Sequence, residues 1–472
     1  MRTVIKDKKA FLILLICCLA SRALTTIYYI EDTDSLRFAL SITDYDITKM
    51  QPHFPGYPVY CFLAKTIYFF TKSFAITFSI LGGVAVFFII YFILKILKIN
   101  LESVSGLLLS GIVFFNPFIW LMSNRYMPDL FGLALAISSY FFLSVEKNHK
   151  NILIGFLFTG LLAGVRLSYL PILILPFCHS FLTYKNKARL IFIFFLGCIV
   201  WLAPLSLLTG IENLINAALK QTQGHFTDFG GTIITENSWW KRFLMIIRST
   251  WSDGLGGYWI GRSWQTLILS FPMLYVLYFG IKELKVEKKK NIIYLYISFG
   301  IVYATWIFFF QNVLHKSRHI LPLLVPLFVV LHSGLLFLIK KKNILNTILL
   351  ITLFTSTINI TINLILQHKK PSAISSVKSA IVKKGFQFPI ASTPLINYYL
   401  KQHGLENDFL DIESDEDIHA IKLSGEREIF LIGNFKKQFS SDYYIISDSI
   451  YYHNPYVNRM WSEINTYFLA KK

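Results

Sequence analysis

The chain has 472 residues, of which 54% are hydrophobic and only 15% are charged, and its formal net charge is +19. This composition excludes an ordinary soluble globular protein. The lysines and arginines fall mostly in short clusters between apolar runs, which is typical of membrane topology signals and not of a nucleic-acid-binding surface. The five cysteines lie inside apolar segments without metal-ligand spacing, so neither a disulfide framework nor a thiolate metal site is indicated.

Apolar runs long enough to cross a bilayer recur along the chain and predict about eleven transmembrane helices. The first run, residues 10–30, is too long for a signal-peptide core and is interpreted as a retained span. The second span is expected at residues 73–94 and the last at residues 344–366. Residues 55–70, rich in Tyr and Phe, are expected to form an interfacial or re-entrant helix.

The gaps between the runs alternate in charge and predict the orientation of the chain. Basic gaps, which should be cytoplasmic, are the N-terminus, Lys95 with Lys98, and residues 147–150, 185–189, 282–290 and 340–342. Outward gaps, which mix acids, aromatics and glycines, are residues 31–54, 124–129, the turn near Arg166, 211–262 and 311–319. We therefore expect a multi-pass protein, plausibly of a bacterial inner membrane, with a cytoplasmic N-terminus and an extracytoplasmic C-terminus.

The composition of the sequence changes after residue 366, where long apolar runs give way to mixed polar and apolar residues. Helix-like runs at residues 372–384 and 394–403 alternate with strand-like runs at 388–392, 409–412, 428–432 and 443–447. The expected fold is thus an α-helical polytopic membrane domain, residues 1–366, followed by a small extracytoplasmic α/β domain, residues 367–472. Two outer loops of the membrane domain are prominent, residues 31–54 and residues 211–262.

Acidic residues are scarce, so their positions are informative. Asp32 and Asp34 directly follow the first run, where restricted water could tune a carboxylate for general-base chemistry. Asp44 and Asp46, further along the loop, are expected to be merely solvated. Asp129 begins the fourth span after Pro128, where it could cap the helix, act in catalysis, or do both.

Cations at the outer edge run against the positive-inside bias and suggest an anion there, most simply a lipid phosphate. They cluster in His315, Lys316, Arg318 and His319. Arg166 is another outward cation in apolar sequence, for which snorkelling to the interface is the alternative interpretation.

The long outer loop contains Trp and basic residues at 238–243, which predict a helix lying in the plane of the interface. The glycines of residues 253–259 are interpreted as a mobile loop. The sequence contains no nucleotide-binding loop and no zinc-binding helix motif, so a nucleotide-driven pump is not expected.

The arrangement resembles the C-type (GT-C) glycosyltransferase superfamily, and most of all the branch of protein O-mannosyltransferases and aminoarabinose transferases. Asp34-Ser35-Leu36-Arg37-Phe38-Ala39 resembles that branch's stretch with the catalytic Asp, and Asp129 resembles its second outer acid. His53-Phe54-Pro55-Gly56-Tyr57-Pro58 is similar to its His/Lys-Pro-Pro element, and Arg318-His319-Ile320-Leu321-Pro322 to its late Arg-Tyr-x-x-Pro element. Ser35, Phe54 and His319 depart from the pattern.

The resemblance implies an inverting enzyme that takes a hexose or pentose from a polyprenyl-phosphate carrier. Asp34, with Asp32 and Asp129, would supply catalytic carboxylates. Lys316, Arg318, Arg166 and His315 would bind the donor phosphate, and His53 and Tyr57 would belong to the acceptor side or its loop.

The expected partners are the lipid-linked sugar, membrane lipid, and a glycan, lipid or protein acceptor, with no nucleic acid. Asp32-Thr33-Asp34 has the Asp-x-Asp form that binds a divalent metal elsewhere in the superfamily, but the branch works without metal, so no cofactor is expected. The alternative is a transporter, flippase or glycan polymerase. Acids at the outer edges, without an inverted repeat, favour the enzyme.

Overall fold

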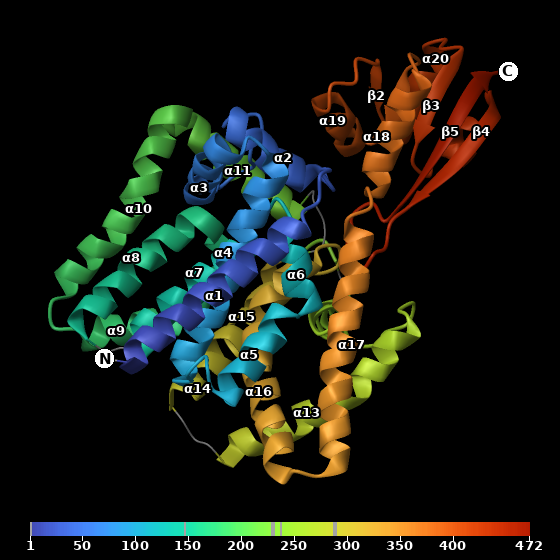
Figure 1. Ribbon diagram of the computed structural model, residues 1–472. Helices are drawn as coiled ribbons and strands as arrows, with labels where there is room; N and C mark the ends of the chain where they lie inside the picture. The colour runs from blue at the N-terminus through green and yellow to red at the C-terminus, as the bar shows by residue number, and fades with distance from the viewer. Residues whose placement is uncertain (1, 146–147, 228–231, 237, 287–289) are drawn as a thin grey trace. The chain divides into compact units, whose positions relative to one another are not determined.

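The computed structural model describes residues 2–145, 148–227, 232–236, 238–286 and 290–472, and most of them are helical (Figure 1). The chain forms two compact units. The first comprises Met1–Thr26 with Phe38–Leu366, and the second comprises Ile27–Arg37 with Gln367–Lys472. Lys147 and residues 287–289 of the expected basic gaps, and residues 228–231 and 237 of the long outer loop, lie outside the described residues.

The helices as far as Leu366 form a bundle with short irregular connections. In chain order they are α1 (Arg2–Leu24), α2 (Thr33–Thr43), α3 (Pro58–Thr71), α4 (Phe74–Leu97), α5 (Val104–Phe114), α6 (Pro117–Asn124), α7 (Asp129–Ser144), α8 (His149–Arg166), η1 (Leu167–Leu173), α9 (Ile174–Thr183), α10 (Lys187–Thr209), α11 (Ile211–Thr227), α12 (Trp239–Arg248), η2 (Ser249–Gly254), α13 (Trp264–Val286), α14 (Lys290–Leu295), η3 (Tyr296–Val302), α15 (Tyr303–Phe310), η4 (Ser317–Leu323), α16 (Leu324–Lys341) and α17 (Ile344–His368). The division between the units falls within α2 and near the end of α17.

Seven helical stretches of the described chain are long and apolar enough to cross a membrane, and the bent pair α5–α6 would add an eighth. The protein is therefore an integral membrane protein, but the predicted number of about eleven spans is too high by this measure. The first predicted span is not among these stretches, because α1 ends at Leu24 and charged residues precede Ala10. The fourth is only 16 residues long, as α7.

One of the seven stretches, His149–Thr183, folds back on itself. Arg166 has extended dihedral angles, φ −155° and ψ 85°, so α8 stops there. The Phe156 ring packs 4.3 Å from the Phe177 ring, and the His149 ring lies 5.1 Å from the Tyr184 ring. The chain thus reverses direction at Arg166, where the sequence predicted a turn.

Close glycine contacts fix two helix crossings in the bundle. A Cβ added to Gly160 on α8 would lie 2.4 Å from the carbonyl oxygen of Phe194 on α10. A Cβ added to Gly334 on α16 would lie 2.0 Å from the carbonyl oxygen of Val276 on α13. Small residues let backbones approach closely where lipid supplies no hydrophobic drive between helices.

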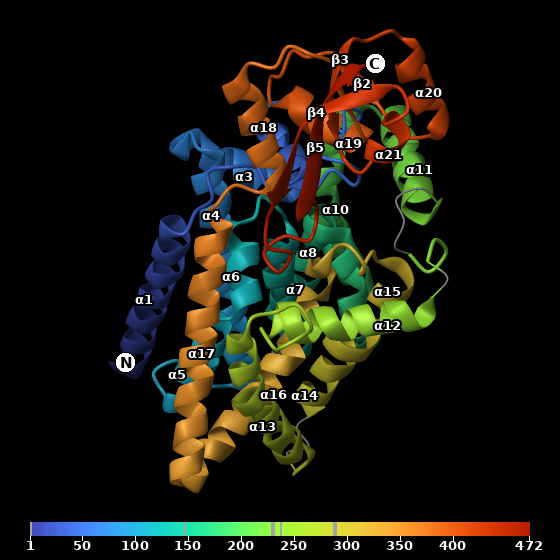
Figure 2. The same cartoon turned by 90° about the vertical axis from the view of Figure 1, so that its right-hand side faces the viewer.

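Two helices were predicted to lie at the membrane interface, and both segments are helical but too short to be candidate spans. α3 has 14 residues and begins with Pro58, and it is not among the candidate spans. α12 lies across the bundle in Figure 2, with Trp239 and Trp240 exposed. Arg242 is its buried anchor, donating to the carbonyls of Phe308 and Gln311 at the end of α15.

The glycine-rich stretch after α12 differs from its prediction. Gly254, Gly256 and Gly257 are buried, and a Cβ added to Gly257 would lie 2.2 Å from the Trp251 ring. The expected mobile loop is wrong at these positions, because the glycines serve close packing.

The second unit contains a five-stranded sheet of order β2-β1-β3-β5-β4. Its elements are α18 (Ala373–Lys384), β1 (Ile390–Ser392), α19 (Pro394–Gln402), β2 (Phe409–Asp411), α20 (Asp415–Leu423), β3 (Glu428–Ile432), α21 (Lys436–Phe439), β4 (Tyr443–Tyr452) and β5 (Glu463–Lys471). β2, β1 and β3 are parallel, and β5 and β4 add antiparallel pairs. The predicted α/β fold class is confirmed, while α20 and β5 were not predicted.

One face of this sheet carries the core of the second unit. Ala391, Leu431 and Leu469 from three strands pack with Ile418 and Ile421 of α20. Phe430, which alternates with Leu431 along β3, faces the other side of the sheet, where the ring of Phe386 stacks on it with centroids 5.0 Å apart. The alternation of short β-branched strands with helices is what the sequence pattern of residues 388–432 encodes.

Candidate active site

A buried ion-pair cluster in the first unit joins one carboxylate to two guanidinium groups. Asp129 starts α7, and its Oδ1 lies 2.8 Å from Nη2 of Arg166 and 3.7 Å from Nε of Arg318. The three side chains are only 2%, 8% and 9% exposed. Asp129 thus lies in the first turn of α7, at the positive end of the helix, while its carboxylate pairs with both guanidinium groups, and the cluster has one formal positive charge in excess.

Three segments distant in sequence place these side chains. Arg166 sits at the reversal between α8 and η1, and Arg318 belongs to η4 just before α16. Gly132, one turn into α7, leaves room for Arg166, because a Cβ there would lie 2.6 Å from the Arg166 Cβ. Arg166 is thus bound inside the protein, and the snorkelling interpretation does not describe it.

Tyr57 and His53 continue the cluster on the side of the first outer loop. Arg166 Nη1 donates to the Tyr57 hydroxyl at 3.3 Å, and that hydroxyl lies 3.0 Å from Nε2 of His53. A hydroxyl that accepts from an arginine can also donate to Nε2 or accept from it, and the tautomer of His53 decides which of the two atoms donates. The Phe38 ring packs edge-on against Tyr57 at 5.0 Å and closes this side.

Several residues around the cluster were not predicted as site residues. The Tyr60 hydroxyl donates to the Met127 carbonyl at 2.8 Å, and Met127 Sδ lies 3.2 Å from Nη1 of Arg318. The Tyr303 hydroxyl donates to the His319 carbonyl at 3.1 Å. The two tyrosines stand in aromatic-rich apolar helices and look like ordinary packing residues in sequence.

The cations predicted at residues 315–318 differ in how deeply they are buried. Arg318 is buried in the cluster, whereas His315 is exposed and Lys316 is partly buried. The amide of His315 donates to Oδ1 of Asn312 at 3.1 Å, which shapes the turn before η4. Of this segment, Arg318 is the cation that the structure joins to Asp129.

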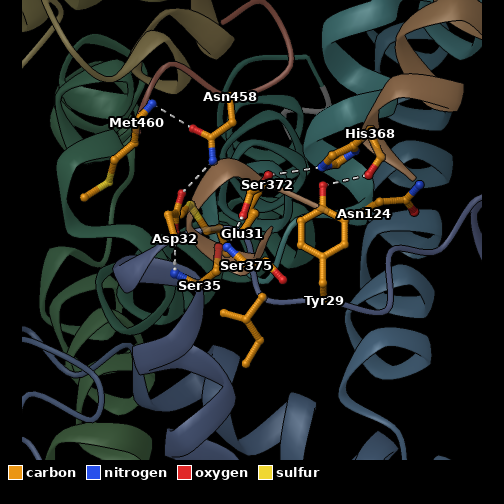
Figure 3. A network of polar contacts seen from close by, with 12 residues as sticks. Tyr29, Glu31, Asp32, Ser35, Asn124, His368, Ser372, Ser375, Asn458 and Met460 are labelled. Carbon is orange, nitrogen blue, oxygen red and sulfur yellow. Dashed lines mark hydrogen bonds and ion pairs between the residues drawn. The ribbon is translucent and has the colours of Figure 1, made fainter. Parts of the chain in front are cut away.

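Asp32 and Asp34 belong to the second unit, with residues 367–472. Asp32 precedes α2, and its Oδ1 accepts from the Ser35 amide at 2.8 Å, as an N-cap does. Its Oδ2 accepts from Nδ2 of Asn458 at 3.2 Å (Figure 3). Asp32 therefore has both carboxylate oxygens engaged.

Asp34 lies in the first turn of α2 and is 5% exposed. Its Oδ1 is 3.7 Å from Nη1 of Arg37, a looser contact than the hydrogen bonds of Asp32. Asp44 and Asp46 both pair with Lys49, but Asp44 is exposed whereas Asp46 is partly buried and also accepts from the Thr48 amide at 2.9 Å.

The Asp32-Thr33-Asp34 sequence has the Asp-x-Asp form that was considered for a divalent metal. Within the described residues, no group of three or more His, Cys, Asp or Glu side chains is placed to hold a metal ion. The oxygens of Asp32 face a backbone amide and an asparagine amide, which are donors and not metal ligands.

No protein-family model and no curated protein matches the sequence. Among solved structures, the chain is similar to ArnT from Cupriavidus metallidurans bound to undecaprenyl phosphate, with a TM-score of 0.55 and 8% identity over 98% of this chain and 97% of that one. The apo state of the same protein gives a TM-score of 0.53 and 7% identity over the same shares. The likeness extends over nearly the whole of both chains and shows that this chain shares the fold of ArnT.

Proposed function

We propose that this protein is a membrane glycosyltransferase that moves a sugar from a polyprenyl-phosphate donor to a hydroxyl group of an extracytoplasmic acceptor, with inversion at the anomeric carbon. The observation that carries the proposal is the buried Asp129–Arg166–Arg318 cluster in a bundle with the ArnT fold. The crystal structure of ArnT that shares this fold holds undecaprenyl phosphate.

The two arginines suit the phosphate of such a donor. A guanidinium presents paired donors that match phosphate oxygens, and a buried position excludes competing water. As the sugar leaves, negative charge grows on the phosphate, and fixed cations stabilise that charge more than they stabilise the ground state. Lys316 and His315, less buried than Arg318, would attract the lipid phosphate toward this cluster.

We assign Asp129 to fixing the positions of the two guanidinium groups by ion pairing, and not to acting as the base. Protonating its carboxylate would weaken both ion pairs, to Arg166 and to Arg318. Tyr57 supports Arg166 from the other direction, because its hydroxyl accepts from that guanidinium. We assign both residues to positioning the phosphate-binding guanidinium groups.

Asp34 is the carboxylate best suited to act as the base. It would take the proton of the acceptor hydroxyl while that oxygen attacks C1 of the sugar and the bond from C1 to the phosphate oxygen breaks. The electron pair of that bond leaves with the polyprenyl phosphate, and attack from the opposite side inverts C1. We assign Asp32, whose oxygens accept from Ser35 and Asn458, to holding the start of α2.

The charge pattern supports an outer location for the arginine cluster. Asp129 and Arg166 lie at one end of α7 and α8, while His149 and Tyr184, beside basic residues, meet at the other end. The positive-inside rule assigns the basic end to the cytoplasm. We therefore infer a cytoplasmic N-terminus and an extracytoplasmic second unit.

The transporter alternative would use a broken helix as an ion or substrate site. The described chain offers the 56° bend between α5 and α6 as a candidate. Its freed carbonyls are bound by protein donors: Arg22 Nη2 donates to Phe114 at 3.0 Å and the Thr361 hydroxyl donates to Phe115 at 2.7 Å. The break is thus closed by side chains, which favours a structural role.

The decisive experiment is transfer of labelled sugar from polyprenyl-phosphate sugars by the purified protein in liposomes. We expect Asp34→Asn to abolish transfer and Lys316→Ala to weaken use of the donor, while Asp44→Asn, which alters an exposed acid of the same loop, behaves as wild type. Full activity of Asp34→Asn would refute the assignment of the base. Absence of transfer from every such donor would overturn the proposed reaction.

A further inference from the structure

The segment that carries Asp34 does not belong to the same unit as the rest of the N-terminal chain. Ile27–Arg37 groups with Gln367–Lys472, although nearly the whole bundle separates the two in sequence. The contacts that hold it there involve its backbone, Glu31 and Asp32, and they come from several places in the C-terminal part.

The first anchor is a chain of hydrogen bonds through Asn458. Its Oδ1 accepts from the Met460 amide at 3.0 Å, which turns its Nδ2 toward Oδ2 of Asp32 at 3.2 Å. The other oxygen of Asp32 accepts from the amide of Ser35, in the first turn of α2. Figure 3 shows these residues in one line, running from the loop before β5 to the start of α2.

The second anchor holds the residues just before Asp32. Oε2 of Glu31 is 3.1 Å from Nε2 of His368, and both side chains are no more than 2% exposed. The Tyr399 hydroxyl donates to the carbonyl of Ile30 at 2.5 Å, and the Tyr29 hydroxyl donates to the carbonyl of His368 at 2.8 Å. Side chains and backbone of the segment are thus both held.

We propose that the C-terminal domain is a positioning module whose Asn458 and His368 fix the start of α2 through Asp32 and Glu31, and so set the direction of the Asp34 carboxylate. Asp34 follows Asp32 by two residues at the start of the same helix, so a shift of the cap moves it directly. Asp32, Glu31, Asn458 and His368 are positioning residues. The proposal rests on Asp34 as the base of the proposed transferase, and it assigns the C-terminal domain a part in that reaction.

The geometry supplies a charge-swap test. Asn458→Asp places a carboxylate against Asp32, because the Met460 amide still holds one oxygen of the new side chain. The double variant Asp32→Asn/Asn458→Asp restores one donor facing one acceptor, and the amide oxygen introduced by Asp32→Asn can still accept from the Ser35 amide. Asn434→Ala is the matched control, since Asn434 accepts from Asn465 at 2.7 Å in an exposed pair of the same domain.

In the full-length protein in liposomes, Asn458→Asp should lower kcat for sugar transfer by about 10- to 100-fold, the loss expected from a misplaced catalytic group. KM for the lipid-linked donor should stay near the wild-type value. The double variant should recover most of kcat, and Asn434→Ala should match wild type. A double variant as slow as Asn458→Asp, or an Asn458→Asp protein with wild-type kcat, overturns the proposal.

Amide hydrogen exchange separates this inference from the proposed reaction. Asn458→Asp should raise exchange in the peptide that covers residues 27–37, and the double variant should lower it again. If the wild type transferred no sugar, the reaction would fail, while this exchange pattern would still demonstrate the anchoring. Unchanged exchange in Asn458→Asp overturns the anchoring whatever the activity.

Discussion

The carboxylate of Asp129 lies 2.8 Å from the guanidinium of Arg166, and both side chains are less than a tenth exposed. A buried pair of this kind is strongly destabilising when one partner alone is removed, by about 3–5 kcal/mol. Asp129→Ala should therefore lower the free energy of unfolding by that order, because Arg166 and Arg318 both lose their shared counter-charge. Asp129→Ala/Arg166→Met should be more stable than Asp129→Ala and still inactive.

Thermal unfolding in detergent, combined with the transfer assay, checks this prediction. Lys49→Ala, which breaks an exposed pair with Asp44, is the control and should change the free energy of unfolding by about 0–1 kcal/mol. An equal decrease in the free energy of unfolding in Asp129→Ala and Lys49→Ala would contradict a buried ion-pair cluster at Asp129.

Arg318→Lys should weaken the binding of a lipid phosphate although the charge is kept. A lysine supplies a point charge without the planar pair of donors, so the contact with phosphate oxygens loses its geometry. We expect the dissociation constant for undecaprenyl phosphate to rise by about tenfold, the cost of one hydrogen bond of roughly 1.4 kcal/mol. Lys340→Gln, at the opposite end of α16, should bind as wild type does, and equal affinities of all three proteins would argue against Arg318 as a phosphate ligand.

Gly160→Ala and Gly334→Ala should each destabilise the bundle by about 1–3 kcal/mol, the usual cost of overpacking. The new Cβ atoms would lie 2.4 Å and 2.0 Å from carbonyl oxygens of the neighbouring helices, so the backbones must move apart. Gly300→Ala is the control, because a Cβ there meets nothing within 4 Å among the described residues. Unfolding temperatures in detergent should rank the two crossing variants below the control, and any other order would speak against these crossings.

The second unit should lose stability in mild acid through His403. Burial, more than the nearby charge of Lys378, lowers the pKa of His403 below its ordinary value of 6.5, although the hydrogen bond to the Tyr399 carbonyl partly opposes the shift. The unfolded chain then binds a proton at a higher pH than the folded one does. The contribution of His403 to the stability of the second unit is therefore complete above about pH 6.5, and it declines as the pH falls toward the lowered pKa.

Hydrogen exchange of residues 394–412 at pH 5 and pH 7.5 measures this loss. His403→Gln should exchange similarly at the two pH values once the intrinsic pH dependence of exchange is removed. A wild-type protein whose corrected protection is the same at both values would contradict the assignment.

Orientation can be tested with single cysteines in a protein whose native cysteines are replaced. Lys401→Cys should react with an impermeant thiol reagent added outside intact cells, and Lys187→Cys should react only after the membrane is opened. The reason is the asymmetry of basic residues between the two ends of the bundle. Labelling of residue 401 from the cytoplasm alone would reverse the proposed topology and exclude an extracytoplasmic acceptor.

Much of the architecture could be predicted because hydropathy and turn signals are local. α4 and α17 lie close to the predicted second and last spans, and the strands from β1 to β3 coincide with predicted runs. The count of about eleven exceeds the seven long apolar stretches because the prediction also counted α1, the 16-residue α7, the bent pair α5–α6 and both legs of His149–Thr183.

The site could be predicted only as a set of candidates. Charged residues are rare in this chain, so Asp129, Arg166 and Arg318 were visible individually. Their pairing depends on the reversal at Arg166 and on the space left by Gly132, which are properties of packing and not of spacing. The membership of Ile27–Arg37 in the second unit could not be predicted, because nothing local to those residues points to Asn458 or His368.

The grouping of Ile27–Arg37 with Gln367–Lys472 also sets the order in which the second unit can fold during synthesis. Ile27–Arg37 is synthesised before the rest of the membrane bundle, and Asn458 is synthesised after it. Domains generally fold as units from the N-terminus onward. The second unit can fold completely only after its strands β4 and β5 have been synthesised. The acid-bearing segment therefore gains its partners only after residues 367–472 have been made, and a chain that stops before them carries a membrane bundle without an assembled acid segment.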